Sequence, residues 1–351
     1  MNQSMTIAVD LATTVFEIAI ADERGRIQQR KRLSRSQFLR FLATHPVANL
    51  VMEACGTAHY WGREAVKHGH QVRLLPAQYV ARYRLRNKTD RADCDALLEA
   101  SRRADILPVP IKTEHQQAIQ ALHRMRSQWM SCRTARINAL RGLLREHGIM
   151  LPPGAKAAIK AAPTAVDDER LPLPLRHGLL MLIGEILSLE ERVAFAEREL
   201  KNAASADEAA AQLMQIPGIG LLIATALIAS AGSPSNFKSG RHLAAWLGLT
   251  PREHSSGERR HLGGISKRGD VYVRTLLVHG ARSVLNQAKR NAAAGKPLSR
   301  LQRWGLELQA RVGHNKAACG VANKIARISW AVWQHGRSFD PNHGGELAMA
   351  A

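Results

Sequence analysis

Short runs of apolar residues, several of them alternating with polar ones, mark the first hundred residues as a mixture of strands and helices. Five runs predict β-strands: Thr6–Val9, Val15–Ile20, Arg26–Leu33, Asn49–Met52 and Gln71–Leu75. Apolar residues at helical spacing predict two helices between the later strands, over Ser34–Thr44 and Thr57–His68, with Ser36 as the expected N-cap of the first. The ADERGR sequence after Ile20 predicts a turn between the second and third strands.

The order of these elements indicates the fold class. Three strands that can pair in antiparallel fashion come first, and helices and strands then alternate. This is the element order of a ribonuclease H-like fold, in which the first and fourth strands are neighbours. We therefore expect an α/β domain over residues 1–112.

The remainder of the chain is predicted to be helical. Gln116–His147 is a long stretch without proline, Leu151–Pro174 is proline-rich and predicts a linker or hairpin tip, and Leu175–Leu200 is a second amphipathic stretch. Two long helices on either side of a break predict an antiparallel coiled-coil hairpin over residues 113–205. An ordinary helical bundle inside one domain is the alternative.

A third, mainly α-helical part is expected over residues 206–340, followed by a small polar tail at 341–351 that we expect to be disordered. It opens with the sequence IPGIG before an apolar helix at Leu221–Ala231. Gly218 and Gly220 would let the backbone approach a phosphate, as in the hairpin of a helix-hairpin-helix element that binds DNA without sequence preference. A glycine turn before a buried helix would give the same sequence.

The charge of the chain favours a polyanionic partner. It has 351 residues, with 50 Lys and Arg against 29 Asp and Glu, and a formal net charge of +21. Such an excess creates a positive field that attracts a phosphate backbone, although a merely basic or ribosome-associated protein would share it. Four cysteines without paired spacing indicate neither a zinc site nor a disulfide framework. No signal sequence or membrane span is predicted, so we expect a cytoplasmic protein without a membrane partner.

Four acidic residues are candidates for a metal site. Asp10 and Glu53 end the first and fourth predicted strands, and Asp90 and Asp93 share one face of a helix if it starts near Asp90. Converging carboxylates suit Mg²⁺ or Mn²⁺, and two such ions could assist cleavage of a phosphodiester. Taken singly, each acid could be a turn, cap or solvated residue, and Asp95 is a weaker candidate because it points away from Asp93. Three nearby cations could follow a phosphate backbone: Arg84, Arg86 and Lys88.

The stretch Thr250–Arg274 has adjacent serines, four glycines and many cations, but no periodic apolar stripe. This composition predicts a loop that holds a hydroxyl nucleophile against a polyanion. Five cations are expected to hold the scissile phosphate: Arg252, Arg259, Arg260, Lys267 and Arg268. A structural Gly-Ser turn that only binds nucleic acid is the alternative.

Five blocks of sequence carry a family resemblance: IAVD at 7–10, MEACGT at 52–57, NKTDRADCDA at 87–96, IPGIG at 216–220 and GLTPREHSSGERRHLGGISKRGD at 248–270. In order and spacing they resemble the DEDD-type bacterial insertion-sequence transposases of the insertion-sequence 110 family. The resemblance implies a RuvC-like domain over 1–112, the coiled-coil segment over 113–205 and a transposase domain over 206–340. It also implies a recombinase guided by a non-coding RNA of its own element, acting on donor and target DNA as a dimer or tetramer.

Carried over residue by residue, the acidic tetrad of that family falls on Asp10, Glu53, Asp90 and Asp93, and its serine falls on Ser256. Ser255 stands beside it, so the choice of attacking hydroxyl is open, and Ser256 is our prediction. The alternatives are a hydrolytic RuvC-like nuclease and a non-catalytic nucleic-acid-binding protein. A minor one is a sugar-kinase or actin-like ATPase, because Asp10–Thr14 resembles a phosphate loop of those proteins, but no second glycine-rich phosphate loop follows in this half.

Overall fold

The computed structural model describes residues 5–85, 87, 89–257 and 259–341. Two predicted nucleic-acid contacts, Arg86 and Lys88, and the predicted tail beyond Pro341 lie outside the described residues. The chain forms two compact units, Met1–His115 and Gln116–Ala351, and each is considered by itself. The further division of the second unit at residue 205 remains a prediction.

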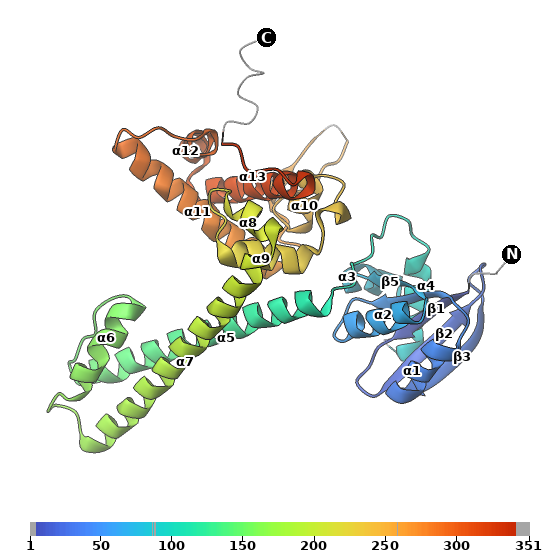
Figure 1. The fold of residues 1–351 in the computed structure, drawn as a ribbon, viewed down its shortest axis with the longest axis horizontal. Coiled ribbons are helices and arrows are strands. Elements are labelled where there is room, and N and C mark those ends of the chain that lie inside the picture. Colours follow the sequence, from blue (N-terminus) through green and yellow to red (C-terminus); the bar gives the residue numbers. More distant parts are fainter. Residues whose placement is uncertain (1–4, 86, 88, 258, 342–351) are drawn as a thin grey trace, which may run out of the picture. The chain divides into compact units, whose positions relative to one another are not determined.

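A five-stranded mixed sheet forms the centre of the first unit (Figure 1). Its strands are β1 (Thr6–Asp10), β2 (Val15–Ala21), β3 (Ile27–Ser34), β4 (Asn49–Glu53) and β5 (Gln71–Leu75). They lie in the order β3-β2-β1-β4-β5, with β1, β2 and β3 antiparallel and β4 and β5 parallel to β1. All five predicted strands are therefore confirmed, as is the neighbouring position of the first and fourth.

The two faces of the sheet bury different side chains. One face packs large residues such as Phe16 against α1 (Arg35–Thr44) and α2 (Ala58–Lys67). The opposite face presents small residues such as Ala8 and Ala19, which allow α4 (Asp90–Ser101) to lie close to β1 and β2. Short turns of helix, α3 (Ala77–Val80) and η1 (Ala81–Tyr83), precede α4.

One predicted helix cap is wrong. The N-cap of α1 is Ser34, whose hydroxyl accepts from the backbone N–H of Gln37. The Gln37 side chain in turn accepts from the backbone N–H of Ser34 at 2.8 Å, which completes a capping box. Ser36 is already inside the helix.

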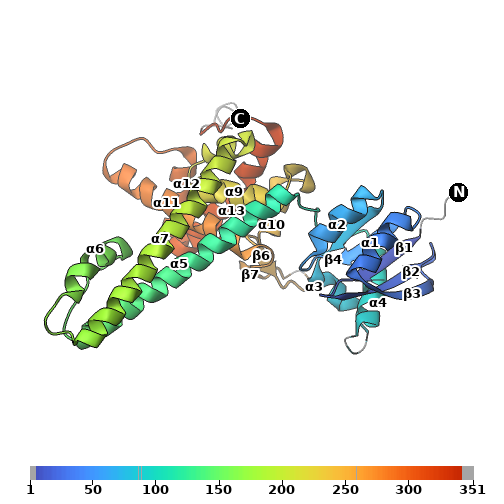
Figure 2. The ribbon, with the colours of Figure 1, turned by 60° about the horizontal axis from the view of Figure 1, so that its bottom comes forward.

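Two long helices of the second unit, α5 (Glu114–Glu146) and α7 (Leu173–Ser205), lie side by side in both views (Figures 1 and 2). Three ion pairs join them: Arg126 to Glu197, Arg133 to Glu190 and Arg136 to Glu185. Residue numbers rise along α5 as they fall along α7, so the pair is antiparallel, as predicted. The connection is not a plain linker, because α6 (Ala155–Val166) forms there and packs on α7 in spite of Pro163.

The rest of the second unit packs helices around one large core. Its helices are α8 (Glu208–Met214), α9 (Leu221–Ala231), η2 (Pro234–Asn236), α10 (Gly240–Trp246), α11 (Val271–Ala293), α12 (Arg300–Val312) and α13 (His314–His335). Between α10 and α11 stand two short antiparallel strands, β6 (Pro251–Glu253) and β7 (Leu262–Ile265). In the part of the chain that is described, no helix is long and apolar enough to cross a membrane.

Candidate active site

The first two predicted acids stand next to each other at one edge of the sheet. Asp10 and Glu53 are the last residues of β1 and β4, and the parallel register pairs Val9 with Met52 one step earlier. Because side chains alternate along a strand, both acids share the sheet face of Ala8 and Val51, which is the face that α4 covers. Burial raises the pKa of the nearby Cys55 thiol, and the negative charges of Glu53 and Asp10 raise it further. Both carboxylates therefore act on the same small region.

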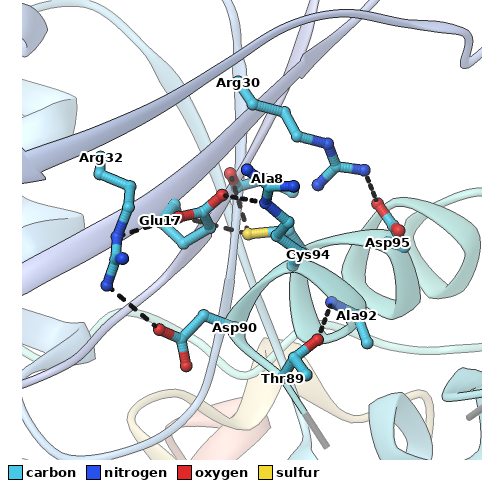
Figure 3. A network of polar contacts seen from close by, with 10 residues as sticks. Ala8, Glu17, Arg30, Arg32, Thr89, Asp90, Ala92, Cys94 and Asp95 are labelled. Atoms are coloured by element: carbon cyan, nitrogen blue, oxygen red, sulfur yellow. Dashed lines mark hydrogen bonds and ion pairs between the residues drawn. The ribbon is translucent and has the colours of Figure 1, made fainter. Parts of the chain in front are cut away.

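The other two acids occupy the first turn of α4, which begins at Asp90 as predicted. Thr89 caps this turn, since its hydroxyl accepts from the backbone N–H of Ala92 at 3.2 Å. Asp93 is 7% exposed, and its Oδ1 accepts from Arg84 Nε at 2.5 Å. Asp90 is exposed, with its Oδ2 3.8 Å from Arg32 Nη2 (Figure 3). The predicted phosphate contact Arg84 thus faces a predicted metal ligand.

Cys94 fixes α4 against the sheet beneath these acids. Its thiol donates to the backbone oxygen of Glu17 at 3.3 Å and lies 3.9 Å from that of Ala8 (Figure 3). Burial raises the pKa of Cys94 to about 12, and the negative charges of Asp10 and Glu17 also act to raise it. The thiol therefore stays protonated at neutral pH and serves as a hydrogen-bond donor, not as a nucleophile.

Glu17 is a further acidic residue of this face, beyond the four predicted from the sequence. It is the register partner of Asp10 on β2 and is only 4% exposed. Arg32 Nε lies 3.5 Å from one of its carboxylate oxygens and Arg91 Nε 3.8 Å from the other. Strand parity could have identified it, because Glu17 is the one acid on a face of β2 otherwise made of Val15, Ala19 and Ala21.

Asp95, the weaker candidate, lies apart from Asp93. Its Oδ1 pairs with Arg30 Nη2 on β3 at 2.6 Å, and its side chain is half exposed (Figure 3). Such an exposed ion pair is worth at most about 1 kcal/mol. The contact links α4 to β3 at the edge of the sheet.

The acids have the chemistry of a magnesium site, since carboxylate oxygens are the ligands that Mg²⁺ and Mn²⁺ prefer. Within the described residues, however, no three His, Cys, Asp or Glu side chains converge closely enough to hold a metal. Asp10 and Glu53 are neighbours, whereas Asp93 is turned to Arg84 and Asp90 to Arg32. The four carboxylates have suitable donor chemistry, but in this arrangement Asp90 and Asp93 face guanidinium groups.

The predicted serine loop is a β-hairpin. Pro251 pairs with Ile265 and Glu253 with Leu262, and beyond the strands the backbones of Ser256 and Arg259 bond to each other in both directions. Gly257 follows Ser256 with a φ of +55°, a left-handed conformation that glycine adopts at low cost. We call residues 251–265 the serine hairpin; both serines in it are exposed.

The two serine hydroxyls have different surroundings. Ser255 Oγ donates to Glu253 Oε1 at 2.8 Å and accepts from the backbone N–H of His261 at 3.2 Å. This hydrogen bond from Ser255, and the nearby guanidinium of Arg260, lower the pKa of Glu253. Ser256 Oγ makes no hydrogen bond to any other residue that the structure describes. The hydroxyl of Ser255 is therefore engaged in holding the hairpin, whereas that of Ser256 has no such role among the described residues.

The cations predicted to hold phosphate lie on the same hairpin as these serines or directly after it. Arg252, Arg259 and Arg260 are exposed on the serine hairpin, and Arg260 Nε pairs with Glu253 at 3.2 Å. Lys267 and Arg268 follow the second strand at the base of the serine hairpin, and Lys267 has a φ of +56°.

A buried cation that was not predicted from the sequence fixes this base. Arg274 is 7% exposed, and its Nη1 donates to the backbone oxygens of Leu247 at 3.0 Å and Arg268 at 3.2 Å. Arg274 thereby ties the hairpin to the end of α10.

The predicted phosphate turn at 216–220 joins α8 to α9. Gly218 has a φ of +89°, and a Cβ there would lie 2.9 Å from the backbone oxygen of Gly280 and 2.8 Å from Val284. Close packing on α11 is thus sufficient to require glycine at this position. Gly220 is exposed at the start of α9 with open space around it, which leaves its backbone accessible.

Comparison with known proteins places both halves of the chain among transposases. Residues 7–149 match a family model described as transposase (DEDD_Tnp_IS110), and residues 210–295 match the transposase IS116/IS110/IS902 family. A probable family 20 transposase of Pseudomonas aeruginosa is 41% identical over 97% of this chain and its own full length. The transposase of insertion sequence element IS1111A from Coxiella burnetii is 39% identical over 95% of this chain and 90% of its own. The transposase of insertion sequence element IS1328 from Yersinia enterocolitica is 38% identical over 95% of this chain and 98% of its own.

These similarities extend over nearly the whole chain and include all five blocks that first indicated the family. The chain therefore belongs to the IS116/IS110/IS902 family of insertion-sequence transposases. Membership implies an enzyme that cuts and rejoins DNA, and the DEDD domain suggests the use of divalent metal.

Proposed function

We propose that this transposase cuts and rejoins DNA through a covalent phosphoserine link at Ser256. The observation that carries the proposal is the difference between the two adjacent serines. Ser255 uses its hydroxyl to bind Glu253 and His261, whereas Ser256 stands at the exposed turn with its hydroxyl unengaged among the described residues. A nucleophile must be accessible and close to groups that stabilise negative charge, and the arginines of the serine hairpin are such groups.

The proposed step conserves the energy of the phosphodiester bond. Ser256 Oγ attacks the scissile phosphorus, a new P–O bond forms, and the bond from phosphorus to the deoxyribose oxygen of the leaving strand breaks. The serine proton passes to a base and the leaving oxygen takes up a proton. Rejoining is the reverse reaction with the deoxyribose hydroxyl of another DNA end. Arg252, Arg259, Arg260, Lys267 and Arg268 are proposed to hold the phosphate during both steps.

We further propose that Asp10, Glu53, Asp90 and Asp93 hold Mg²⁺ or Mn²⁺ in a ribonuclease H-like domain. A divalent ion there would polarise a phosphodiester and stabilise the leaving oxygen. The neighbouring ends of β1 and β4 and the first turn of α4 support this assignment. Arg84 neutralises Asp93 in the absence of an ion and is free to contact phosphate once an ion binds.

Other parts of the proposal rest on the family resemblance. They are guidance by an RNA from the element itself, assembly into a dimer or tetramer, a coiled-coil role for α5 and α7, and action in the bacterial cytoplasm. The backbone at Gly218 and Gly220 and the cations Arg86 and Lys88 are proposed as further contacts to nucleic acid.

Two single substitutions test the nucleophile. Ser256→Ala is expected to abolish a denaturation-resistant protein–DNA adduct on an electrophoresis gel while leaving DNA binding near the wild-type level. Ser255→Ala is the matched control and should retain the adduct. Loss of the adduct only in Ser255→Ala would move the nucleophile by one residue. Cleavage that survives both changes but is lost in Asp10→Ala would mean that the enzyme is a hydrolytic nuclease.

A further inference from the structure

An open pocket of about 500 Å³ lies between the first turn of α10 and the second half of α13. Gly240 allows the two helices to touch, since a Cβ there would lie 2.8 Å from the backbone oxygen of Arg327. Trp330 is fixed in the pocket wall because its Nε1 donates to the backbone oxygens of Pro234 at 3.0 Å and Phe237 at 3.2 Å. The pocket is thus built from packed elements.

Three cations and no acid line this pocket. The cations are Arg241, Lys324 and Arg327, and the remaining lining includes the apolar side chains of Ile328 and Trp330. Across the described ranges of the chain, no carboxylate lies within ion-pair distance of any of the three cations. Lys324 instead has its ammonium 4.3 Å from the ring centre of Trp304 on α12.

The positive charges in this pocket repel one another. Lys324 and Arg327 are three residues apart on α13, a spacing at which like charges are neighbours and destabilise a helix. Burial lowers the pKa of Lys324, and the charges of Arg300 and Arg327 lower it further. A bound anion would relieve this repulsion, and the apolar floor beside the cations would suit the carbon face of a sugar.

We propose that this pocket binds one nucleotide of a nucleic-acid strand, with its phosphate held by Arg241, Lys324 and Arg327. A guanidinium offers a planar pair of donors to phosphate oxygens, and an ammonium adds a point charge. The sugar lies against the apolar side chains of Ile328 and Trp330 in the pocket lining. The inference rests on the proposed action on nucleic acid, but not on Ser256 or the acidic residues. DNA and RNA share the required chemistry.

The test measures how binding depends on salt. Lys324→Gln/Arg327→Gln is compared with Lys156→Gln/Lys160→Gln, which removes two exposed charges from α6. Affinity for a 20-base-pair DNA duplex and for a 20-nucleotide RNA is measured by fluorescence anisotropy over a series of NaCl concentrations. For each phosphate that the protein no longer neutralises, the slope of log affinity against log salt becomes shallower by about 0.9 for duplex DNA and by about 0.7 for a single strand. We expect the pocket variant to neutralise about one phosphate fewer and to bind about tenfold more weakly, and the control to change far less.

The possible outcomes distinguish DNA from RNA as the bound strand and test the proposal itself. A shallower slope with DNA alone assigns the nucleotide to DNA, and a shallower slope with RNA alone assigns it to RNA. Equal changes in both double variants, or no change in the pocket variant, would overturn the proposal. The substitutions remove like-charge repulsion but also the contact of Lys324 with Trp304, so the pocket variant should melt close to the wild-type temperature. If it fails to fold, Arg327→Gln alone replaces it and should still make the slope shallower. The salt slope is a binding measurement and the Ser256 test measures a covalent adduct, so the two proposals can fail independently.

Discussion

A buried histidine makes the stability of the second unit depend on pH, and its surroundings give the direction and the size of the effect. His123 on α5 is 3% exposed and joins three helices. Thr225 Oγ1 donates its single proton to the backbone oxygen of Leu221 at 2.8 Å, so it must accept from His123 Nε2 at 3.0 Å. His123 Nδ1 then accepts from the Tyr272 hydroxyl at 3.1 Å. Both ring nitrogens are used, and the ring is neutral.

Burial lowers the pKa of His123 to about 4, and the charge of Arg126 lowers it further. Well above pH 6.5 the imidazole is neutral in both the folded and the unfolded chain, so it makes no pH-dependent contribution. As the pH falls from 6.5 to 4, the unfolded chain takes up a proton that the folded chain does not, and stability is lost. The loss is about 2 kcal/mol at pH 5 and about 3 kcal/mol near pH 4, at about 1.4 kcal/mol for each unit.

Urea unfolding at pH 7 and pH 5, followed by tryptophan fluorescence, measures this loss. His123→Gln removes the titrating ring, so its unfolding free energy should fall between these pH values by about 2 kcal/mol less than that of the wild type. His279→Gln on α11 is the matched control, because His279 is exposed, and it should keep the wild-type pH dependence. An unchanged pH dependence in His123→Gln would refute the assignment of a neutral, buried imidazole.

The remaining predictions concern the glycine turn and the acidic residues. Gly218→Ala should destabilise the chain by about 2–4 kcal/mol through its positive φ and its close contacts with Gly280 and Val284, as measured by urea unfolding. Gly220→Ala has open space around it and changes only an N-cap glycine, so it should cost no more than about 1 kcal/mol; similar losses in both would contradict the packing described. Asp93→Asn, or removal of divalent metal with EDTA, should lower DNA cleavage at least about 100-fold in a gel assay. Asp95→Asn breaks only a half-exposed ion pair and should retain cleavage, and a loss as large as that of Asp93→Asn would show that Asp95 belongs to the site.

The strands of the first unit could be predicted because short apolar or alternating runs are a local property of the sequence. The stretches around Val9 and Val51 are short continuous apolar runs, the stretch around Ile18 alternates, and the structure confirms each as a strand. The burial of Glu17 depends instead on the register of β1 with β2 and on the approach of α4. Those are tertiary features, and local sequence carries little of them.

Three features that the sequence did not predict also depend on tertiary contacts or lack a local pattern. Helix α6 forms although Pro163 removes a backbone donor, because Ala158, Ala162 and Val166 bury an apolar face. The serine hairpin has strands of three and four residues rich in polar residues and glycine, which leave no alternation to detect. Arg274 resembles any other cation in a basic sequence, and only the backbone oxygens of Leu247 and Arg268 distinguish it.

The most direct test of the proposed chemistry is to locate the DNA on the protein. Digestion of the trapped adduct with nuclease and trypsin should leave the peptide Glu253–Arg259, EHSSGER, carrying residual nucleotide. Fragmentation in a mass spectrometer separates the two serines of this peptide. We predict the nucleotide mass on Ser256. Nucleotide on Ser255, or unmodified peptide despite efficient DNA cleavage, would contradict the proposal.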